Sequence, residues 1–191
     1  MIARRKHLML LSNVLPRGYL RMDGYSFNGG TYFDTGELST EDMKIEMEFT
    51  INTVTDQAFF GSRLRLKVRN YSFFVKDGVF YCSANTNQIS TDIPAEAGSY
   101  SVVYTPRDAL INGVKIDYSN NSFVGSLNTV YVGGCHQMME AYEPAVFVLH
   151  GFKFYKGDAL LHNYIPCVRL EDGCTGLFDS VENCFKEPSV I

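Results

Sequence analysis

The chain has 191 residues and a mass of 21.5 kDa, the size of a single domain. Its composition is 46% hydrophobic, 20% charged and 14% aromatic, with 16 Gly and 6 Pro, which excludes a disordered or collagen-like chain. No apolar run approaches the roughly eighteen residues of a membrane span, so we predict a globular protein that does not associate with a membrane.

The first 22 residues are basic and the remainder is acidic. The net charge is −4, but residues 1–22 contain no acidic residue. The rest of the chain carries 12 basic residues against 21 acidic ones. We predict a basic N-terminal arm over residues 1–22, followed by a folded domain over residues 23–191. A basic arm of this kind can dock on an acidic protein surface, and its docking residues would be Arg4, Arg5, Lys6, Arg17 and Arg21.

The first sixteen residues resemble an export signal only superficially. The apolar run Leu8–Leu11 is shorter than the apolar core of a signal peptide, and no small-residue cleavage site follows it. We therefore expect a chain that is not exported. Its five cysteines are then expected to stay reduced, since their number is odd and intracellular thiols rarely pair.

From residue 30 onward the sequence alternates between apolar and polar residues, as strands with one buried face do. In Met43–Ile51 every odd position is apolar, and Arg63–Arg69 alternates with the opposite parity. Asn112-Gly113 between apolar flanks indicates a type I′ hairpin, and Lys76-Asp77-Gly78 is a weaker turn of this kind. Further strands are predicted at Tyr71–Lys76, Val79–Ser83, Gln88–Ile93, Tyr100–Thr105, Asn128–Val132, Val146–Tyr155, Leu160–Pro166 and Gly176–Phe178.

No helical period is sustained for three turns. So many short strands in one domain predict an all-β protein, an antiparallel two-sheet β-sandwich of the jelly-roll type.

Three sets of motifs, in order along the chain, strengthen this prediction. The first is LPRGY at Leu15–Tyr19 with GGTYFDTG at Gly29–Gly36, and the second is KIEMEF at Lys44–Phe49 with FFGSR at Phe59–Arg63. The third is FKFY at Phe152–Tyr155, YIPCVR at Tyr164–Arg169 and GLFD at Gly176–Asp179. Together they resemble the concanavalin A-like, laminin-G-like jelly-roll domains of bacterial and tailed-phage proteins. The resemblance implies a fold in which ligands are held by rim loops or by the concave sheet; it implies no catalytic residue.

Two charged patterns lie on predicted strands. Glu46 and Glu48 share one strand face, where paired carboxylates can hydrolyse glycosides. Lys44 beside them favours ionisation and the third acid of jelly-roll glucanases is missing, so we favour an exposed charged face. Arg63, Arg65, Lys67 and Arg69 would form a basic stripe that binds anions or, as we favour, pairs with the glutamates or protects an edge strand.

Several residues could act in predicted loops. Tyr118, Asn120 and Asn121 lie in one loop, and His136, Gln137 and Tyr142 lie in another; all six are candidate ligand or partner contacts. The set His162, Cys167, Cys174 and Cys184 lacks zinc-site spacing, and adjacent Cys135 and His136 point apart on an extended chain, so no metal, cofactor or thiol catalysis is expected.

The main functional hypothesis is a non-enzymatic structural and binding module. It would be a phage virion component, either a capsid decoration or a tail or fibre subunit, made in the host cytoplasm. Its partners would be other virion proteins, copies of itself or a cell-surface glycan, and not nucleic acid or a membrane. The alternative is a carbohydrate-binding, lectin-like protein. A glycoside hydrolase that uses Glu46 and Glu48 remains as the enzyme-class contrast.

Overall fold

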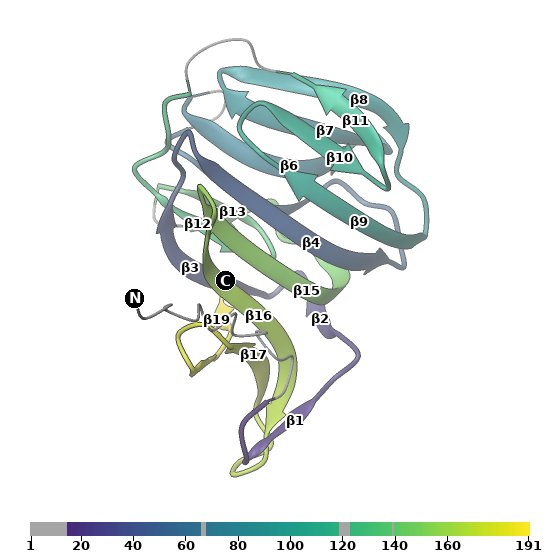
Figure 1. The fold of residues 1–191 in the computed structure, drawn as a ribbon. Coiled ribbons are helices and arrows are strands. Elements are labelled where there is room, and N and C mark those ends of the chain that lie inside the picture. The colour runs from purple at the N-terminus through teal and green to yellow at the C-terminus, as the bar shows by residue number, and fades with distance from the viewer. Residues whose placement is uncertain (1–14, 66–67, 119–122, 139) are drawn as a thin grey trace, which may run out of the picture.

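The computed structural model describes residues 15–65, 68–118, 123–138 and 140–191. These residues form nineteen strands and contain no helix. The strands build two sheets that face each other (Figure 1). The predicted antiparallel β-sandwich is confirmed. In the described ranges nothing has the helical length and apolarity that crossing a membrane would require.

The first sheet has ten strands. Its main path in space is β11 (Val114–Asp117), β10 (Asp108–Ile111), β9 (Gly98–Tyr104), β4 (Met43–Ile51), β15 (Val146–Lys156), β16 (Ala159–Arg169), β17 (Thr175–Asp179) and β18 (Cys184–Lys186). Two short strands attach beside this path, β1 (Tyr19–Arg21) to β16 and β2 (Tyr25–Asn28) to β15. The long strands β4, β15 and β16 form its centre.

The second sheet has nine strands. Its main path is β19 (Ser189–Val190), β3 (Thr31–Leu38), β12 (Thr129–Val132), β5 (Gln57–Arg63), β6 (Asn70–Lys76), β7 (Val79–Asn85) and β8 (Asn87–Pro94). The hairpin of β13 (Cys135–Gln137) and β14 (Glu140–Tyr142) joins it through a parallel contact of β13 with β5.

Alternation along the strands decides which side chains fill the space between the sheets. In β4 the odd-numbered residues are at most 1% exposed, and the even-numbered ones lie on the outer face. The interior is rich in aromatic rings; Phe49 of one sheet, for example, lies 4.5 Å from Phe59 of the other between ring centroids. Tyr104 of β9 also crosses the interior, and its hydroxyl lies 2.8 Å from the carbonyl oxygen of Ser72 on β6.

The predicted hairpins are present. Asn112 and Gly113, which connect β10 and β11, both have positive φ angles, 48° and 82°. Asp77 and Gly78 connect β6 and β7 in the same way, with φ angles of 51° and 74°. Both pairs have the positive φ values that a type I′ turn requires.

The strand predicted at Arg63–Arg69 is wrong. Strand β5 ends at Arg63, and the chain then reverses through backbone hydrogen bonds between residues 64, 65 and 68 before β6 begins at Asn70. Arg69 itself has a positive φ of 51°. The alternation of charged residues here belongs to a turn, so the predicted basic stripe does not form; Lys67 lies outside the described residues.

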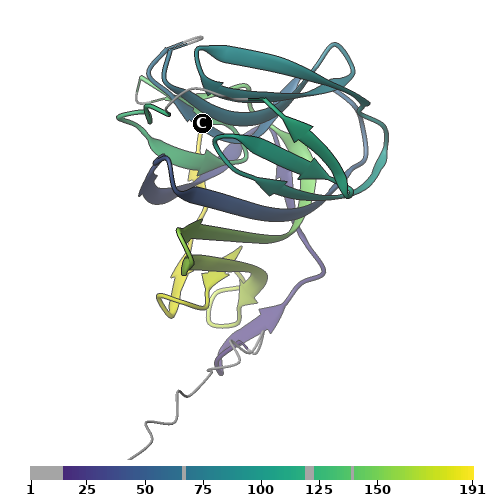
Figure 2. The same cartoon turned by 45° about the horizontal axis from the view of Figure 1, so that its top comes forward.

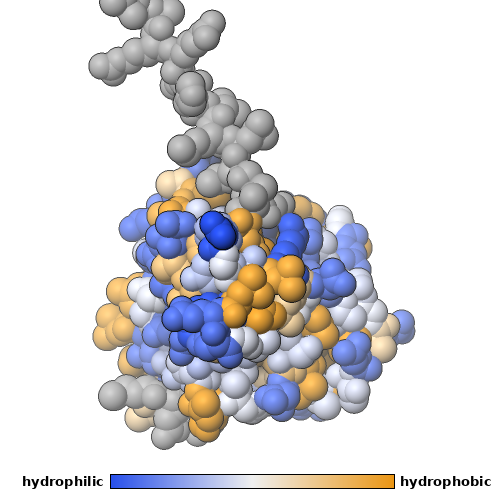
Figure 3. All heavy atoms as spheres, turned by 90° about the horizontal axis from the view of Figure 1, so that it is seen from below, coloured by the Kyte–Doolittle hydropathy of each residue, from blue (hydrophilic) through white to orange (hydrophobic). Residues whose placement is uncertain are grey.

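The described part of the predicted N-terminal arm is paired with the sheet. Strand β1 lies antiparallel to β16, with Leu20 opposite Val168, and both Arg17 and Arg21 are exposed. Arg4, Arg5 and Lys6 lie outside the described residues. Figures 1 and 2 place β1, β16 and β17 at one end of the molecule, away from β7 and β8. Seen from that end, apolar and hydrophilic areas alternate on the surface (Figure 3).

Candidate functional site

The outer face of the ten-stranded sheet contains a groove of about 220 Å³. It crosses the adjacent strands β9, β4, β15 and β16, and β1 contributes one side chain to it. Its polar side chains are Arg21, Glu46, Glu48, Ser101, His150, Lys153 and Asn163. The predicted charged face of Glu46 and Glu48 is therefore confirmed, and the structure adds neighbours from four other strands that the sequence did not connect with it.

Gly151, in the middle of β15, lines the groove. The pairing of β15 with β4 shifts register between Leu149 and Gly151, which is a β-bulge, and Gly151 then lies opposite Glu48. Gly151 has no positive φ, and a Cβ atom placed on it would meet no atom within 4 Å. Neither backbone geometry nor crowding requires a glycine here. A glycine inside a strand often marks a place where a ligand comes close to the backbone.

Glu46 is held as a carboxylate by its neighbours. It accepts hydrogen bonds from Lys44 Nζ at 2.7 Å and from the Tyr155 hydroxyl at 3.1 Å, and Lys153 Nζ lies 3.6 Å away. Burial opposes its ionisation, but these donors outweigh burial and lower the pKa of Glu46. Glu46 therefore stays charged, and Lys44 covers the ring of Tyr155 at 3.9 Å from its centroid.

Glu48 and Arg21 line the groove without partners of their own. Both side chains are exposed, and neither forms an ion pair or hydrogen bond with a described residue. Arg21 was predicted as a partner-docking residue, and the structure places it beside the groove at the end of β1. These two groups are free to bind a ligand.

His150 is fixed in one orientation. Its Nδ1 lies 2.6 Å from the carbonyl oxygen of Asp23, which can only accept, so Nδ1 carries the proton. Its Nε2 then accepts from the Thr50 hydroxyl at 2.8 Å. Both ring nitrogens of His150 therefore have a hydrogen-bond partner within the protein.

The structure contradicts one predicted loop contact. Tyr118 is only 6% exposed; its ring packs against Tyr104, and its hydroxyl donates to the carbonyl oxygen of Thr105. It is a core residue with a satisfied polar end, so it cannot contact a ligand at the surface. The neighbouring candidates Asn120 and Asn121 lie outside the described residues.

The second predicted loop is the β13–β14 hairpin. His136 is half-buried and stacks on Tyr131 with 3.9 Å between ring centroids, and burial lowers its pKa. Gln137 accepts a hydrogen bond from Arg63 Nε at 2.5 Å. The structure therefore uses these two side chains for packing within the nine-stranded sheet. Tyr142 lies on β14, and its side chain is outside the described set.

The cysteines form neither a zinc site with His162 nor a reactive pair of Cys135 with His136. All five are free thiols, and Cys135 is fully buried, which raises the pKa of its thiol to about 12. Among the described residues, the group of metal-ligating side chains that the fold brings together is His162, Asp179 and Glu182, which includes no cysteine. Sequence reasoning named His162 but gave it the wrong neighbours, because Asp179 and Glu182 reach it only through the pairing of β16 with β17.

Comparison with known proteins identifies the fold. No family model and no curated protein matches the chain. Among solved structures, the NanB sialidase from Streptococcus pneumoniae superposes with a TM-score of 0.55 at 16% identity, over 75% of this chain and 26% of that one. The chain thus spans about a quarter of the length of NanB.

Two other solved structures are matched over most of their length. The CBM40 of Ruminococcus gnavus IT-sialidase, bound to α2,3-sialyllactose, gives a TM-score of 0.52 at 13% identity over 74% of this chain and 93% of that one. The SAP-like pentraxin from Limulus polyphemus gives 0.50 at 13% identity over 91% and 93%. At such identities the likeness concerns the fold alone, and this chain has the concanavalin A-like, laminin-G-like jelly-roll fold that its motifs predicted.

Proposed function

We propose that this chain is a non-enzymatic carbohydrate-binding domain that holds a sugar in the groove on its ten-stranded sheet. The observation that carries the proposal is the space above Gly151, flanked by Glu48 and Arg21, which have no partner in the part of the chain that the structure describes. The strand glycine that no structural feature requires lies beside the two charged groups. A polar ligand at this place would fill the open space above Gly151 and form hydrogen bonds with both charged groups.

The lining of the groove suits the hydroxyl groups of a sugar. Glu48 accepts hydrogen bonds, Arg21 donates them, and Ser101 can do both. The volume of about 220 Å³ lies below the roughly 300–1,000 Å³ of pockets for drug-sized ligands, which favours one sugar ring over a long chain. The ring of Tyr155 is covered by Lys44, so recognition would depend on hydrogen bonds more than on stacking.

The fold likeness supports the same class of ligand. The CBM40 structure that superposes on this chain is bound to α2,3-sialyllactose, and 93% of that module is matched. A single polar site of this size binds weakly, and several copies on one particle or surface would gain avidity.

The chemistry of the groove favours binding over hydrolysis. A glycoside hydrolase needs a carboxylic acid that keeps its proton, with a raised pKa, beside a second carboxylate. Glu46 has the opposite setting, because Lys44 and Tyr155 lower its pKa.

The test is a glycan array followed by calorimetry with the sugar that binds. We expect saturable binding that falls at least tenfold in Glu48→Gln, which removes a charge without changing shape, and in Gly151→Val, which fills the space. Glu171→Gln, in the exposed turn after β16, is the matched control and should bind as the wild type does. If no sugar binds, or if both groove variants bind unchanged, the proposal is wrong. Release of a reducing sugar that disappears in Glu48→Gln would instead indicate a hydrolase.

The virion role inferred from the sequence stays a prediction. It depends on the docking residues Arg4, Arg5 and Lys6, which lie outside the described part of the chain. Co-purification of the protein with phage particles, and loss of that association when residues 1–14 are deleted, would support it. Particles that lack the protein would count against it.

A further inference from the structure

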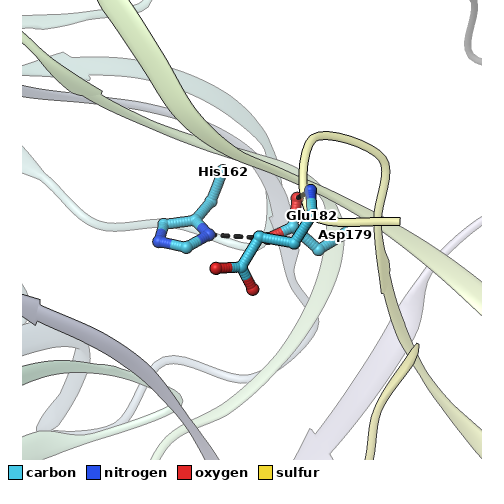
Figure 4. Close-up of side chains that lie close together, drawn as sticks. All are labelled: His162, Asp179 and Glu182. Atoms are coloured by element: carbon cyan, nitrogen blue, oxygen red, sulfur yellow. Dashed lines mark hydrogen bonds and ion pairs between the residues drawn. The ribbon is translucent and has the colours of Figure 1, made fainter. Parts of the chain in front are cut away.

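Four titratable side chains meet where the two sheets come together, and none of the four lines the groove described above. His162 lies on β16, Asp179 ends β17, and Glu182 follows in the turn before β18. Glu37 comes from β3 of the opposite sheet. Figure 4 shows the carboxylate of Glu182 turned towards the imidazole of His162, whose near nitrogen bonds Asp179.

Asp179 orients the imidazole. It is fully buried, and its Oδ1 accepts the backbone N–H groups of Asn163 at 3.2 Å and Val181 at 3.0 Å. Its Oδ2 lies 2.6 Å from Nδ1 of His162. This carboxylate accepts from Nδ1–H, so Nε2 is the ring nitrogen that faces a second group. Metal-binding histidines are usually oriented by a carboxylate in this way.

Nε2 of His162 faces a second carboxylate at a distance that suits a shared ion. It lies 3.4 Å from Glu37 Oε1, and without an ion Nε2–H donates to this carboxylate in a bond that is long for a charge-assisted hydrogen bond of about 2.7–2.9 Å. A bound ion would replace this proton, which is released to solvent. Two ligands at about 2.0–2.1 Å from a tetrahedral zinc ion are roughly 3.3 Å apart. The Glu37 side chain is 36% exposed, so an ion can reach this position from solvent.

Glu182 can provide a third ligand if its side chain turns. Ligand atoms of His162, Asp179 and Glu182 all lie within 4.8 Å of one another. Glu182 is exposed, and its present partner is the Nζ of Lys186 at 2.9 Å. An exposed ion pair of this kind contributes little to stability, so Glu182 can turn to an ion at small cost.

A buried hydroxyl beside the cluster lacks a partner. The ring of Tyr164 stacks on His162 with 5.4 Å between centroids and an interplanar angle of 8°. Tyr164 is 1% exposed, and its hydroxyl has no hydrogen-bond partner among the described residues. Burial, followed by the nearby charges of Asp179 and Glu182, raises the pKa of this phenol. A water molecule held by an ion is the kind of partner that this hydroxyl lacks.

We propose that His162 Nε2, Glu37 and Glu182 bind one Zn²⁺ ion, with Asp179 as the positioning residue that holds the imidazole and water as the remaining ligand. The mixture of one imidazole nitrogen and carboxylate oxygens suits zinc better than calcium or magnesium, which prefer oxygen ligands alone. The cluster holds three carboxylates, while its basic groups are the imidazole and Lys186, which pairs with Glu182, so acidic groups outnumber basic ones and a divalent cation would balance them. Because Glu37 belongs to the other sheet, the ion would link the two sheets.

The test is titration of the full chain, dialysed against a chelator, with Zn²⁺ at pH 7.5 in a calorimeter. We expect one ion per chain, with affinity at least tenfold lower in Glu37→Gln and in His162→Gln. Thermal unfolding without metal shows whether each variant is folded. If His162→Gln does not fold, Glu37→Gln still tests the proposal, because it changes a half-exposed side chain. Zinc should raise the melting temperature of the wild type and of the control Glu171→Gln, but not that of Glu37→Gln.

A further control separates this ligand set from a thiol site. Cys184 Sγ lies 3.5 Å from Glu182 Oε2, so a thiolate could replace one of the proposed ligands. We expect Cys184→Ser to bind zinc as the wild type does. Loss of zinc binding in Cys184→Ser, unchanged binding in Glu37→Gln, or no binding by the wild type at 100 µM Zn²⁺ would each overturn the proposal.

Discussion

The hydroxyl of Tyr104 offers a test of how the two sheets are held together. Tyr104 extends from β9 of one sheet, and its hydroxyl lies 2.8 Å from the carbonyl oxygens of Ser72 and Ser83 on the other sheet. It also accepts the backbone N–H of Ser83 at 3.0 Å. Tyr104 is fully buried, so no water can replace the hydroxyl when it is removed.

Replacing Tyr104 by Phe keeps the ring and removes only these hydrogen bonds. Leaving buried backbone groups without this partner costs about 1–3 kcal/mol. For a domain of this size, about 2 kcal/mol corresponds to a fall in melting temperature of about 4–8 °C. The ring contacts, such as Tyr104 to Phe60 with centroids 5.2 Å apart, should remain.

The assay is urea unfolding and thermal unfolding of Tyr104→Phe beside Tyr100→Phe. Tyr100 lies on the same strand, but its hydroxyl bonds the backbone of Glu96 near the surface, where water can take its place. We expect Tyr100→Phe to lie within about 0.5 kcal/mol of the wild type. If Tyr104→Phe is equally stable, the reasoning that this hydroxyl ties the sheets together is refuted.

Two further predictions concern a turn and a charged pair. Gly113 has a φ of 82° and no atom near a built Cβ, so Gly113→Ala should lower stability by about 1 kcal/mol through backbone strain alone. Gly151→Ala, which adds the same methyl group without a positive φ, should change stability by less than about 0.5 kcal/mol; equal effects in chemical unfolding would contradict this account. Hydrogen bonds from Lys44 and Tyr155 outweigh burial and lower the pKa of Glu46, so its stabilising contribution is present above the ordinary glutamate pKa of 4.5 and is lost as the pH falls through the lower, folded-state value. Glu46→Gln should therefore lose less stability than the wild type in urea unfolding between about pH 5 and pH 3, whereas parallel pH profiles would rule out this role.

The fold was predictable because its signals are local. The alternation in Met43–Ile51 and the pair Asn112-Gly113 each determine a strand or a turn over a few residues, and both are confirmed. The same rule failed at Arg63–Arg69, where alternating charges occupy a turn. Period-two alternation shows which residues would share a face if the chain were extended, but it does not show that the chain is extended.

The candidate sites were only partly predictable. The outward direction of Glu46 and Glu48 followed from their spacing, and a glycine inside the apolar run Val146–Tyr155 was a visible sign of a bulge. What lies beside these residues was not visible, because Arg21 and Lys153 reach the groove from strands far away in sequence. Tyr118 shows the opposite error. Its polar neighbours in sequence led us to predict an exposed loop side chain, but its side chain is buried in the core.

The sequence alone determined that this protein is a two-layer β-sandwich with an aromatic interior and charged outer faces, because side-chain alternation and turn residues act between near neighbours. Only the tertiary structure decided where the groove lies and which side chains meet at His162. Both depend on strand order and register, through which Glu37 and His162, 125 positions apart, come within 3.4 Å. Such contacts arise from how the strands pair, and no local pattern in the chain encodes them.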